Sequence, residues 1–224
     1  MLYKTNQYYE YLELFKKDDC PVCLIMDEWL DNFLEEFLYE CVNDRTMRKR
    51  IMETGGFCPI HAKAMMGKGD PLGHSIIYTV LIDDYIKKPN AKKKDGCLVC
   101  DLETDALRRS LNAFLNFFGE SEEFSDAFRD TKTCICRPHL KGMKKLTRNK
   151  ELIKKLSQVQ NENLTHAKKC LDEIIRKHDY HYTDEQLTDE ERLAWQRAVK
   201  LMSGVLRLRI LSTNSSIKPT HSSK

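Results

Sequence analysis

The chain has 224 residues, 41% hydrophobic and 32% charged, with a formal net charge of +3. This length and hydrophobic content suit one domain or two small ones. The charge is too small to call for a nucleic-acid partner, and no apolar run approaches the ~20 residues that a membrane-spanning helix needs. We see no signal peptide and expect a cytoplasmic protein with no membrane contact, in which thiols stay reduced.

Apolar residues recur at helical spacing along the first half of the chain. The expected helices cover residues 6–17, 24–41, 45–53, 61–66 and 71–87. Gly55-Gly56 ends the third of them. Asp70 as N-cap, with Pro71 at the first helical position, begins the last. Residues 89–96, which include a lysine run, are expected to be a solvated linker.

The second half repeats this helical pattern and then extends it. The expected helices cover residues 102–118, 121–129, 149–178 and 188–202. Asn149 caps the long helix, and Thr188 with Glu191 forms a capping box for the closing helix. No segment alternates with a period of two for long. The sequence therefore predicts an all-α fold.

Two Cys-x2-Cys pairs alternate with two Cys-x2-His pairs, separated by 34 residues in the first copy and 35 in the second. Cys and His are the ligands of tetrahedral structural zinc sites, and Cys3His is a common set. We therefore predict one zinc site in each copy. The first is formed by Cys20, Cys23, Cys58 and His61, and the second by Cys97, Cys100, Cys136 and His139.

The two copies match beyond the metal ligands. A shift of 77 residues takes Cys20 to Cys97 and Leu30 to Leu107. After one inserted residue, a shift of 78 takes Cys58 to Cys136. This pattern indicates an internal duplication of a metal-clamped helical hairpin. The expected organisation is a first Cys3His unit at 1–89, a second at 90–148, C-terminal helices that pack on both at 149–211, and a disordered tail at 212–224.

Other interpretations of the cysteines remain. The chain has nine cysteines, an odd number that argues against a pure disulfide framework, and a thioredoxin-like motif needs a βαβ context that is missing. Cys41 and Cys170 are interpreted as small buried thiols, while Cys134 competes with Cys136 as a ligand. An iron–sulfur cluster is the alternative to zinc, because thiolates also hold iron.

The motifs predict a metal-binding scaffold but say little about its biochemical function. The first hypothesis is a zinc-stabilised scaffold for a protein partner. The second is a redox or metal sensor, in which thiol oxidation or metal loss melts a hairpin. The third is nucleic-acid binding by the basic residues between Arg137 and Lys155, although a solvated helix face is the favoured explanation for these residues. No nucleophile–base pair or phosphate loop is visible, so we name no catalytic residue. The sequence does not specify the oligomeric state.

The doubled motif is followed by Ile175-Arg-Lys-His-Asp-Tyr180 and then by Glu191 and Trp195. With these segments the chain, from about residue 18 to 204, resembles a family of uncharacterised proteins from Firmicutes and related anaerobes. That family has a doubled Cys3His motif and a C-terminal segment in which arginine is usual where this chain has His181. The resemblance implies a metal-binding helical protein and no known reaction.

Overall fold

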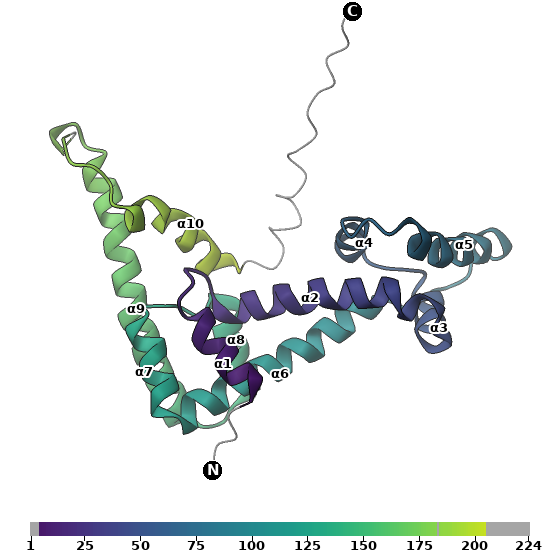
Figure 1. The fold of residues 1–224 in the computed structure, drawn as a ribbon, viewed down its shortest axis with the longest axis horizontal. Helices are drawn as coiled ribbons and strands as arrows, with labels where there is room; N and C mark the ends of the chain where they lie inside the picture. Colours follow the sequence, from purple (N-terminus) through teal and green to yellow (C-terminus); the bar gives the residue numbers. More distant parts are fainter. Residues whose placement is uncertain (1–4, 183, 205–224) are drawn as a thin grey trace, which may run out of the picture. The chain divides into compact units, whose positions relative to one another are not determined.

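The computed structural model describes residues 5–182 and 184–204, and this part of the chain is helical without any strand (Figure 1). The all-α prediction is confirmed. The α-helices are α1 (Asn6–Leu14), α2 (Pro21–Tyr39), α3 (Arg45–Thr54), α4 (Pro59–Met66), α5 (Pro71–Lys87), α6 (Leu98–Glu120), α7 (Glu122–Asp130), α8 (Arg137–Leu146), α9 (Lys150–Lys177) and α10 (Asp189–Ser203). Two 3-10 turns, η1 (Cys41–Asn43) and η2 (Tyr180–Tyr182), complete the list. The tail predicted at 212–224 lies outside the described residues.

The described chain forms two compact units, and unit 1 is built from two separate segments of the chain. Unit 1 contains residues 5–26 and 107–204, and unit 2 is Asp27–Ala106. Helix α2 begins in unit 1 and α6 begins in unit 2, and each continues into the other unit. None of the helices in the described part is long and apolar enough to cross a membrane.

The core of unit 1 is built from aromatic rings on α1, α6 and α7. Phe114 is fully buried, and its ring centroid lies 5.4 Å from those of Tyr11 and Phe124 and 5.5 Å from that of Phe128, in edge-to-face contacts. Such contacts add to the free energy gained from burying the rings. The buried Tyr11 hydroxyl donates to the carbonyl oxygen of Ser110 at 3.1 Å. This cluster fixes α6 against the N-terminal helix.

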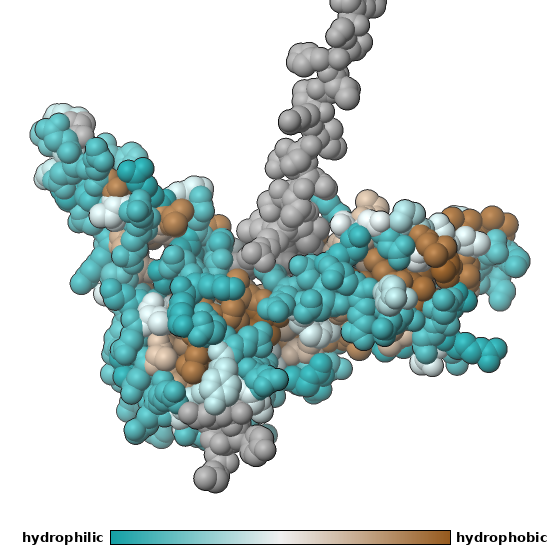
Figure 2. Space-filling model, in the orientation of Figure 1, coloured by the Kyte–Doolittle hydropathy of each residue, from teal (hydrophilic) through white to brown (hydrophobic). Residues whose placement is uncertain are grey.

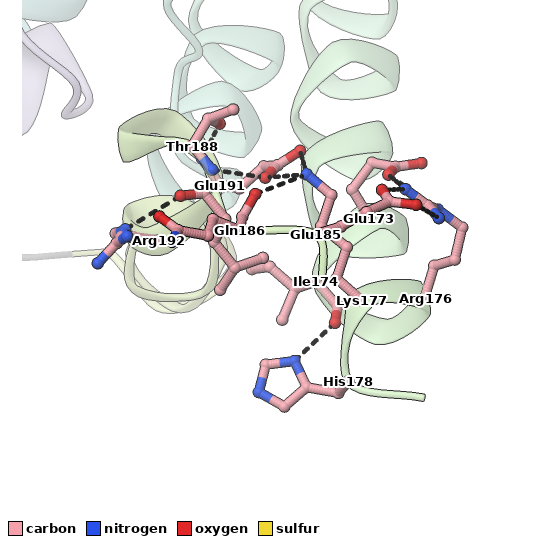
Figure 3. Close-up of polar contacts among 11 residues, drawn as sticks. Glu173, Ile174, Arg176, Lys177, His178, Glu185, Gln186, Thr188, Glu191 and Arg192 are labelled. Carbon is pink, nitrogen blue, oxygen red and sulfur yellow. Dashed lines mark hydrogen bonds and ion pairs between the residues drawn. The ribbon is translucent and has the colours of Figure 1, made fainter. Parts of the chain in front are cut away.

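Helix α10 lies beside the C-terminal part of α9, and polar contacts fix the turn that joins them (Figures 1 and 3). The predicted capping box is present: Glu191 N–H donates to Thr188 Oγ1 at 3.2 Å, and Thr188 N–H donates to the Glu191 carboxylate at 2.8 Å. Lys177 of α9 donates to the same carboxylate at 2.8 Å, with only 10% and 11% of the two side chains exposed. These contacts set where α10 begins.

Unit 2 packs α3, α4 and α5 around the apolar faces that α2 and α6 contribute to it. Asp44 caps α3 by accepting from Met47 N–H, and Asp70 caps α5 by accepting from Leu72 and Gly73 N–H. Gly73 is needed here, because a Cβ would lie 3.1 Å from the carbonyl oxygen of Leu38 and 2.5 Å from the Asp70 carboxylate. The Asp70 side chain therefore caps α5 and also occupies the space that a side chain at position 73 would need.

Two lysines of the predicted linker are anchored on unit 2. Lys94 pairs with Glu53 at 2.7 Å, and Lys93 pairs with Asp84 and donates to the Met52 carbonyl oxygen.

Helix α5, which precedes this linker, carries hydrophobic surface in Figure 2. The exposed apolar side chains of α5 are Leu72, Ile82, Tyr85 and Ile86.

The aromatic cluster gives a stability prediction. Phe114→Ala removes a fully buried ring that contacts several others, so it should lower the free energy of unfolding by about 3–5 kcal/mol. Tyr39→Ala is the control, because Tyr39 is 85% exposed and its loss should cost within about 0.5 kcal/mol. Chemical denaturation of both variants tests this. Equal losses would mean that the ring cluster does not hold unit 1 together.

Candidate metal centres

Each of the four cysteine motifs begins a helix. The carbonyl oxygens of Cys20 and Cys97 accept the first helical hydrogen bonds of α2 and α6, both at 3.1 Å. Those of Cys58 and Cys136 do the same for α4 and α8, both at 2.9 Å. The first cysteine of every motif is therefore the N-cap residue, and the second ligand occupies the third helical position.

This placement explains the x2 spacing. The N-cap side chain and the side chain at the third helical position lie on the same side of the first turn, which is also why capping boxes form there. Proline follows immediately in Cys20-Pro21 and Cys58-Pro59, and its fixed φ suits the first helical position. The partial positive charge at a helix N-terminus also stabilises a thiolate.

The first candidate centre, called site 1, joins the N-termini of α2 and α8. It consists of Cys20, Cys23, Cys136 and His139. His139 Nδ1 lies 3.3 Å from Cys136 Sγ, 3.4 Å from Cys23 Sγ and 3.6 Å from Cys20 Sγ. The sulfurs of Cys23 and Cys136 are 3.6 Å apart. All four residues belong to unit 1.

The second centre, site 2, joins the N-termini of α4 and α6 within unit 2. It consists of Cys58, His61, Cys97 and Cys100. His61 Nδ1 lies 3.3 Å from the sulfurs of Cys58 and Cys100 and 3.6 Å from that of Cys97. Cys58 and Cys100 have their sulfurs 3.7 Å apart.

These distances are those between ligands of one tetrahedral ion. Bond lengths of about 2.3 Å to sulfur and 2.0–2.1 Å to nitrogen place two sulfurs about 3.8 Å apart and a sulfur and a nitrogen about 3.6 Å apart. The observed separations, 3.3–3.7 Å, are close to these values in both centres. Both clusters are therefore shaped to hold a single metal ion.

The structure brings together the eight predicted residues, but the predicted pairing of the motifs is wrong. Each Cys-x2-Cys lies with the Cys-x2-His of the other copy. The reason is the length of α2: its 19 residues span about 28 Å, and α3, with 10 residues, is only about half as long. The chain therefore does not return to Cys20 at Cys58.

Cys134 is not part of site 1, although it lies two residues before Cys136. Its sulfur is 3.9 Å from the Lys132 carbonyl oxygen, and burial raises the pKa of its thiol to about 11. Cys136 takes the position in the cluster. Burial also raises the pKa of the Cys41 and Cys170 thiols, and both side chains are only half-buried.

The two centres differ in their surroundings. In site 1 the three cysteines are 0–1% exposed, and a Cβ added to Gly204, at the end of α10, would lie 3.9 Å from Cys136 Sγ. In site 2, Cys58 and Cys100 are half-buried. Site 2 also has a carboxylate, since Glu103 lies 3.3 Å from His61 Nε2. Carboxylates in that position orient metal-binding histidines.

Site 1 holds one acidic thiol. Hydrogen bonds from the Cys20 and Cys23 thiols lower the pKa of Cys136 to about 4. The same contact with Cys136, followed by that with Cys20 and by burial, raises the pKa of Cys23. Any thiol of the cluster that is still protonated must lose its proton when a metal ion binds. Metal affinity should therefore rise with pH.

In site 2 the acidic thiol pairs with histidine. Burial raises the pKa of Cys97, but the contact with His61 and nearby backbone N–H groups lower it to about 6. Burial likewise lowers the pKa of His61, but Cys97 and Glu103 raise it to about 10. The contact between Cys97 and His61 therefore favours the thiolate and the imidazolium together, and a metal ion bound here would have to displace the proton between them.

Two buried polar side chains of α9 shape the segment that leads into site 1. Gln160 accepts from Ile135 N–H at 2.9 Å and donates to the Ile135 carbonyl oxygen at 2.8 Å. Asn163 donates to the carbonyl oxygens of Phe128 and Thr133 at 3.2 and 2.6 Å. Neither residue was predicted from the sequence. Their signal was polar residues on the apolar face of α9, beside Leu156 and Val159.

Comparison with known proteins gives a family and a relative. The family of unknown function DUF6062 matches residues 11–94 and 83–208. An uncharacterised 23.9 kDa protein in the xynA 3′ region of Caldicellulosiruptor sp. (strain Rt8B.4) is 33% identical over 202 residues, covering 86% of this chain and 98% of that protein. No solved structure matches the chain.

The contacts of Gln160 give a second prediction. Gln160→Leu keeps the volume of the side chain but leaves two buried backbone groups of Ile135 unpaired, at about 1–3 kcal/mol each. The free energy of unfolding should fall by about 2–6 kcal/mol. Gln158→Leu, on the exposed face of the same helix, is the matched control and should change it little. A neutral Gln160→Leu would show that Ile135 needs no such support.

Proposed function

The chain belongs to DUF6062, a family of unknown function, and we propose that it is a zinc-stabilised helical scaffold for a protein partner. Two Cys3His clusters with the ligand separations of a single tetrahedral ion carry this proposal. A closed set of four protein ligands leaves no position for a substrate or a reactive water, which favours a structural role for both ions.

Zinc is favoured over an iron–sulfur cluster by the short distances between ligands. In a four-iron cluster each thiolate binds a different iron atom, so the sulfurs lie farther apart than two ligands of one ion. Here two sulfurs from different motifs are 3.6 Å apart in site 1 and 3.7 Å apart in site 2. Thiolate and imidazole together suit Zn2+.

Each ion would connect segments that are distant in the sequence. Site 1 joins Cys23 to Cys136, and site 2 joins Cys58 to Cys100. Metal binding in small structural sites contributes on the order of 10 kcal/mol to folding. We infer that zinc is part of the folded state of both units. A reducing cytoplasm, which keeps such thiols available, is the proposed location.

A protein is the proposed partner because of the surface of α5. Leu72 and Ile86 are 71% and 70% exposed, and hydrophobic surface gathers there in Figure 2. Exposed apolar patches of this kind often mark protein-binding surfaces. The basic residues between Arg137 and Lys155 are exposed as well, but a solvated helix face accounts for them without nucleic acid.

Pairs of cysteine substitutions test both the zinc sites and their pairing. Cys20→Ser with Cys136→Ser damages site 1 alone, so the protein should keep one of its two zinc ions. Cys20→Ser with Cys58→Ser damages both sites and should lose both ions. Elemental analysis of protein purified without oxygen gives the zinc content per chain.

The pairing inferred from chain order predicts the opposite result, because it assigns Cys20 and Cys58 to one site. Cys41→Ser is the control and should keep both zinc ions, since Cys41 lies outside the two clusters. Iron in place of zinc, or a wild-type protein without metal, would overturn the zinc assignment.

A redox or metal sensor is the second candidate, and the exposure of site 2 favours it. Cys58 and Cys100 are half-buried, with their sulfurs 3.7 Å apart, whereas the cysteines of site 1 are almost fully buried. Hydrogen peroxide would accept two electrons from these two thiolates and two protons from the solvent, which would form one disulfide and two water molecules and release the zinc ion. Loss of this ion would free α4 from α6.

Peroxide treatment should therefore release one zinc ion several-fold faster than the other. Peptide mapping should place the first disulfide among Cys58, Cys97 and Cys100, with Cys20, Cys23 and Cys136 still reduced. The physical reason is access to the sulfur atoms. Release of both ions at one rate would argue that neither centre is specialised as a sensor.

A further inference from the structure

A third group of potential metal ligands lies in unit 1, outside the two Cys3His centres. His166 and Cys170 are four residues apart on α9, and Glu190 is in the first turn of α10. One ligand atom from each residue lies within 4.8 Å of the other two. Neither the doubled motif nor its spacing points to these residues.

The helices explain why the three side chains meet. Residues i and i+4 share one face of a helix, so His166 and Cys170 both face the start of α10. The capping box at Thr188 and the Lys177–Glu191 ion pair fix that start. Figure 3 shows these contacts at the adjoining turn.

A simple ion pair accounts for only part of the arrangement. His166 Nε2 lies 2.7 Å from Glu190 Oε1, which is a normal hydrogen bond between helices. The His166–Glu190 hydrogen bond does not explain why the thiol of Cys170 lies one helical turn away on the same face of α9. Imidazole, thiolate and carboxylate are the three side-chain ligands of zinc, and two ligands at i and i+4 on one helix are a common arrangement in zinc sites.

We propose that His166, Cys170 and Glu190 form a third, exchangeable zinc site. Tetrahedral ligands of zinc lie about 3.3–3.8 Å apart, so binding requires the His166–Glu190 pair to open and the sulfur to approach. The side chains of His166 and Glu190 are 28% and 53% exposed, which leaves them room to rotate. Water completes the fourth position.

The surroundings make this site weaker than the other two. It has one thiolate where each of the others has three, and its carboxylate is exposed. Lys132 and Arg197 are close enough to Glu190 and Cys170 to act on their charges, and they oppose a bound cation. Zinc should therefore leave this site first when a chelator of moderate affinity is added.

Zinc titration of the full chain, already carrying two zinc ions, tests the proposal. The wild-type protein should take up one further ion, and Cys170→Ser or His166→Gln should each abolish that uptake while keeping the first two. Cys41→Ser and His178→Gln are the matched controls and should still bind the third ion. Zinc should also protect Cys170, but not Cys41, from alkylation as measured by peptide mass spectrometry.

Saturation of the wild-type protein at two ions would overturn the third site and leave the Cys3His centres intact. Unchanged uptake in both Cys170→Ser and His166→Gln would also overturn it, by placing the extra ion elsewhere. Fewer than two tightly held ions in the wild-type protein would instead count against the proposed function, so the two failures are distinguishable. Circular dichroism of each variant confirms that it is folded before its zinc uptake is compared.

Discussion

The central constraint is that every metal-ligand pair begins a helix. A cysteine at the N-cap and a second ligand three residues later share one side of the first turn, so two helix starts supply four ligands. Two partial positive charges then face the three cysteines of each cluster, and they would stabilise the negative charge of thiolates that hold a metal ion. The motif spacing, the prolines after Cys20 and Cys58, and the acidity of Cys136 all follow from this arrangement.

The exchanged pairing makes the two copies depend on each other. Helix α2 starts at site 1 and ends in unit 2, while α6 starts at site 2 and ends in unit 1. Each unit therefore contains the start of one copy's long helix and the Cys-x2-His motif of the other copy. A single copy would therefore present two half-sites without their partner motifs.

Local signals in the sequence were sufficient for most helices and insufficient for contacts between them. Caps at Asp70, Asn149 and Thr188 lie where the sequence predicted them, because capping depends on neighbouring residues. Helix α8 was not predicted. It contains Gly142, a weak helix former, which the structure needs because a Cβ there would lie 2.9 Å from Leu111 of α6. The motif pairing likewise depends on the length and direction of α2, which periodicity does not encode.

The two centres differ at matching positions of the doubled motif, and this difference suits them to different roles. Three residues after the second cysteine, the first copy has Met26, which is 1% exposed, and the second has Glu103, which contacts His61. Apolar packing and the end of α10 exclude water from site 1, whereas site 2 combines a carboxylate with half-buried sulfurs. Exposed thiolates react with oxidants and exchange metal more readily than buried ones. Of the two Cys3His centres, site 1 is therefore better suited to hold a metal ion durably, and oxidation of thiols should begin at site 2.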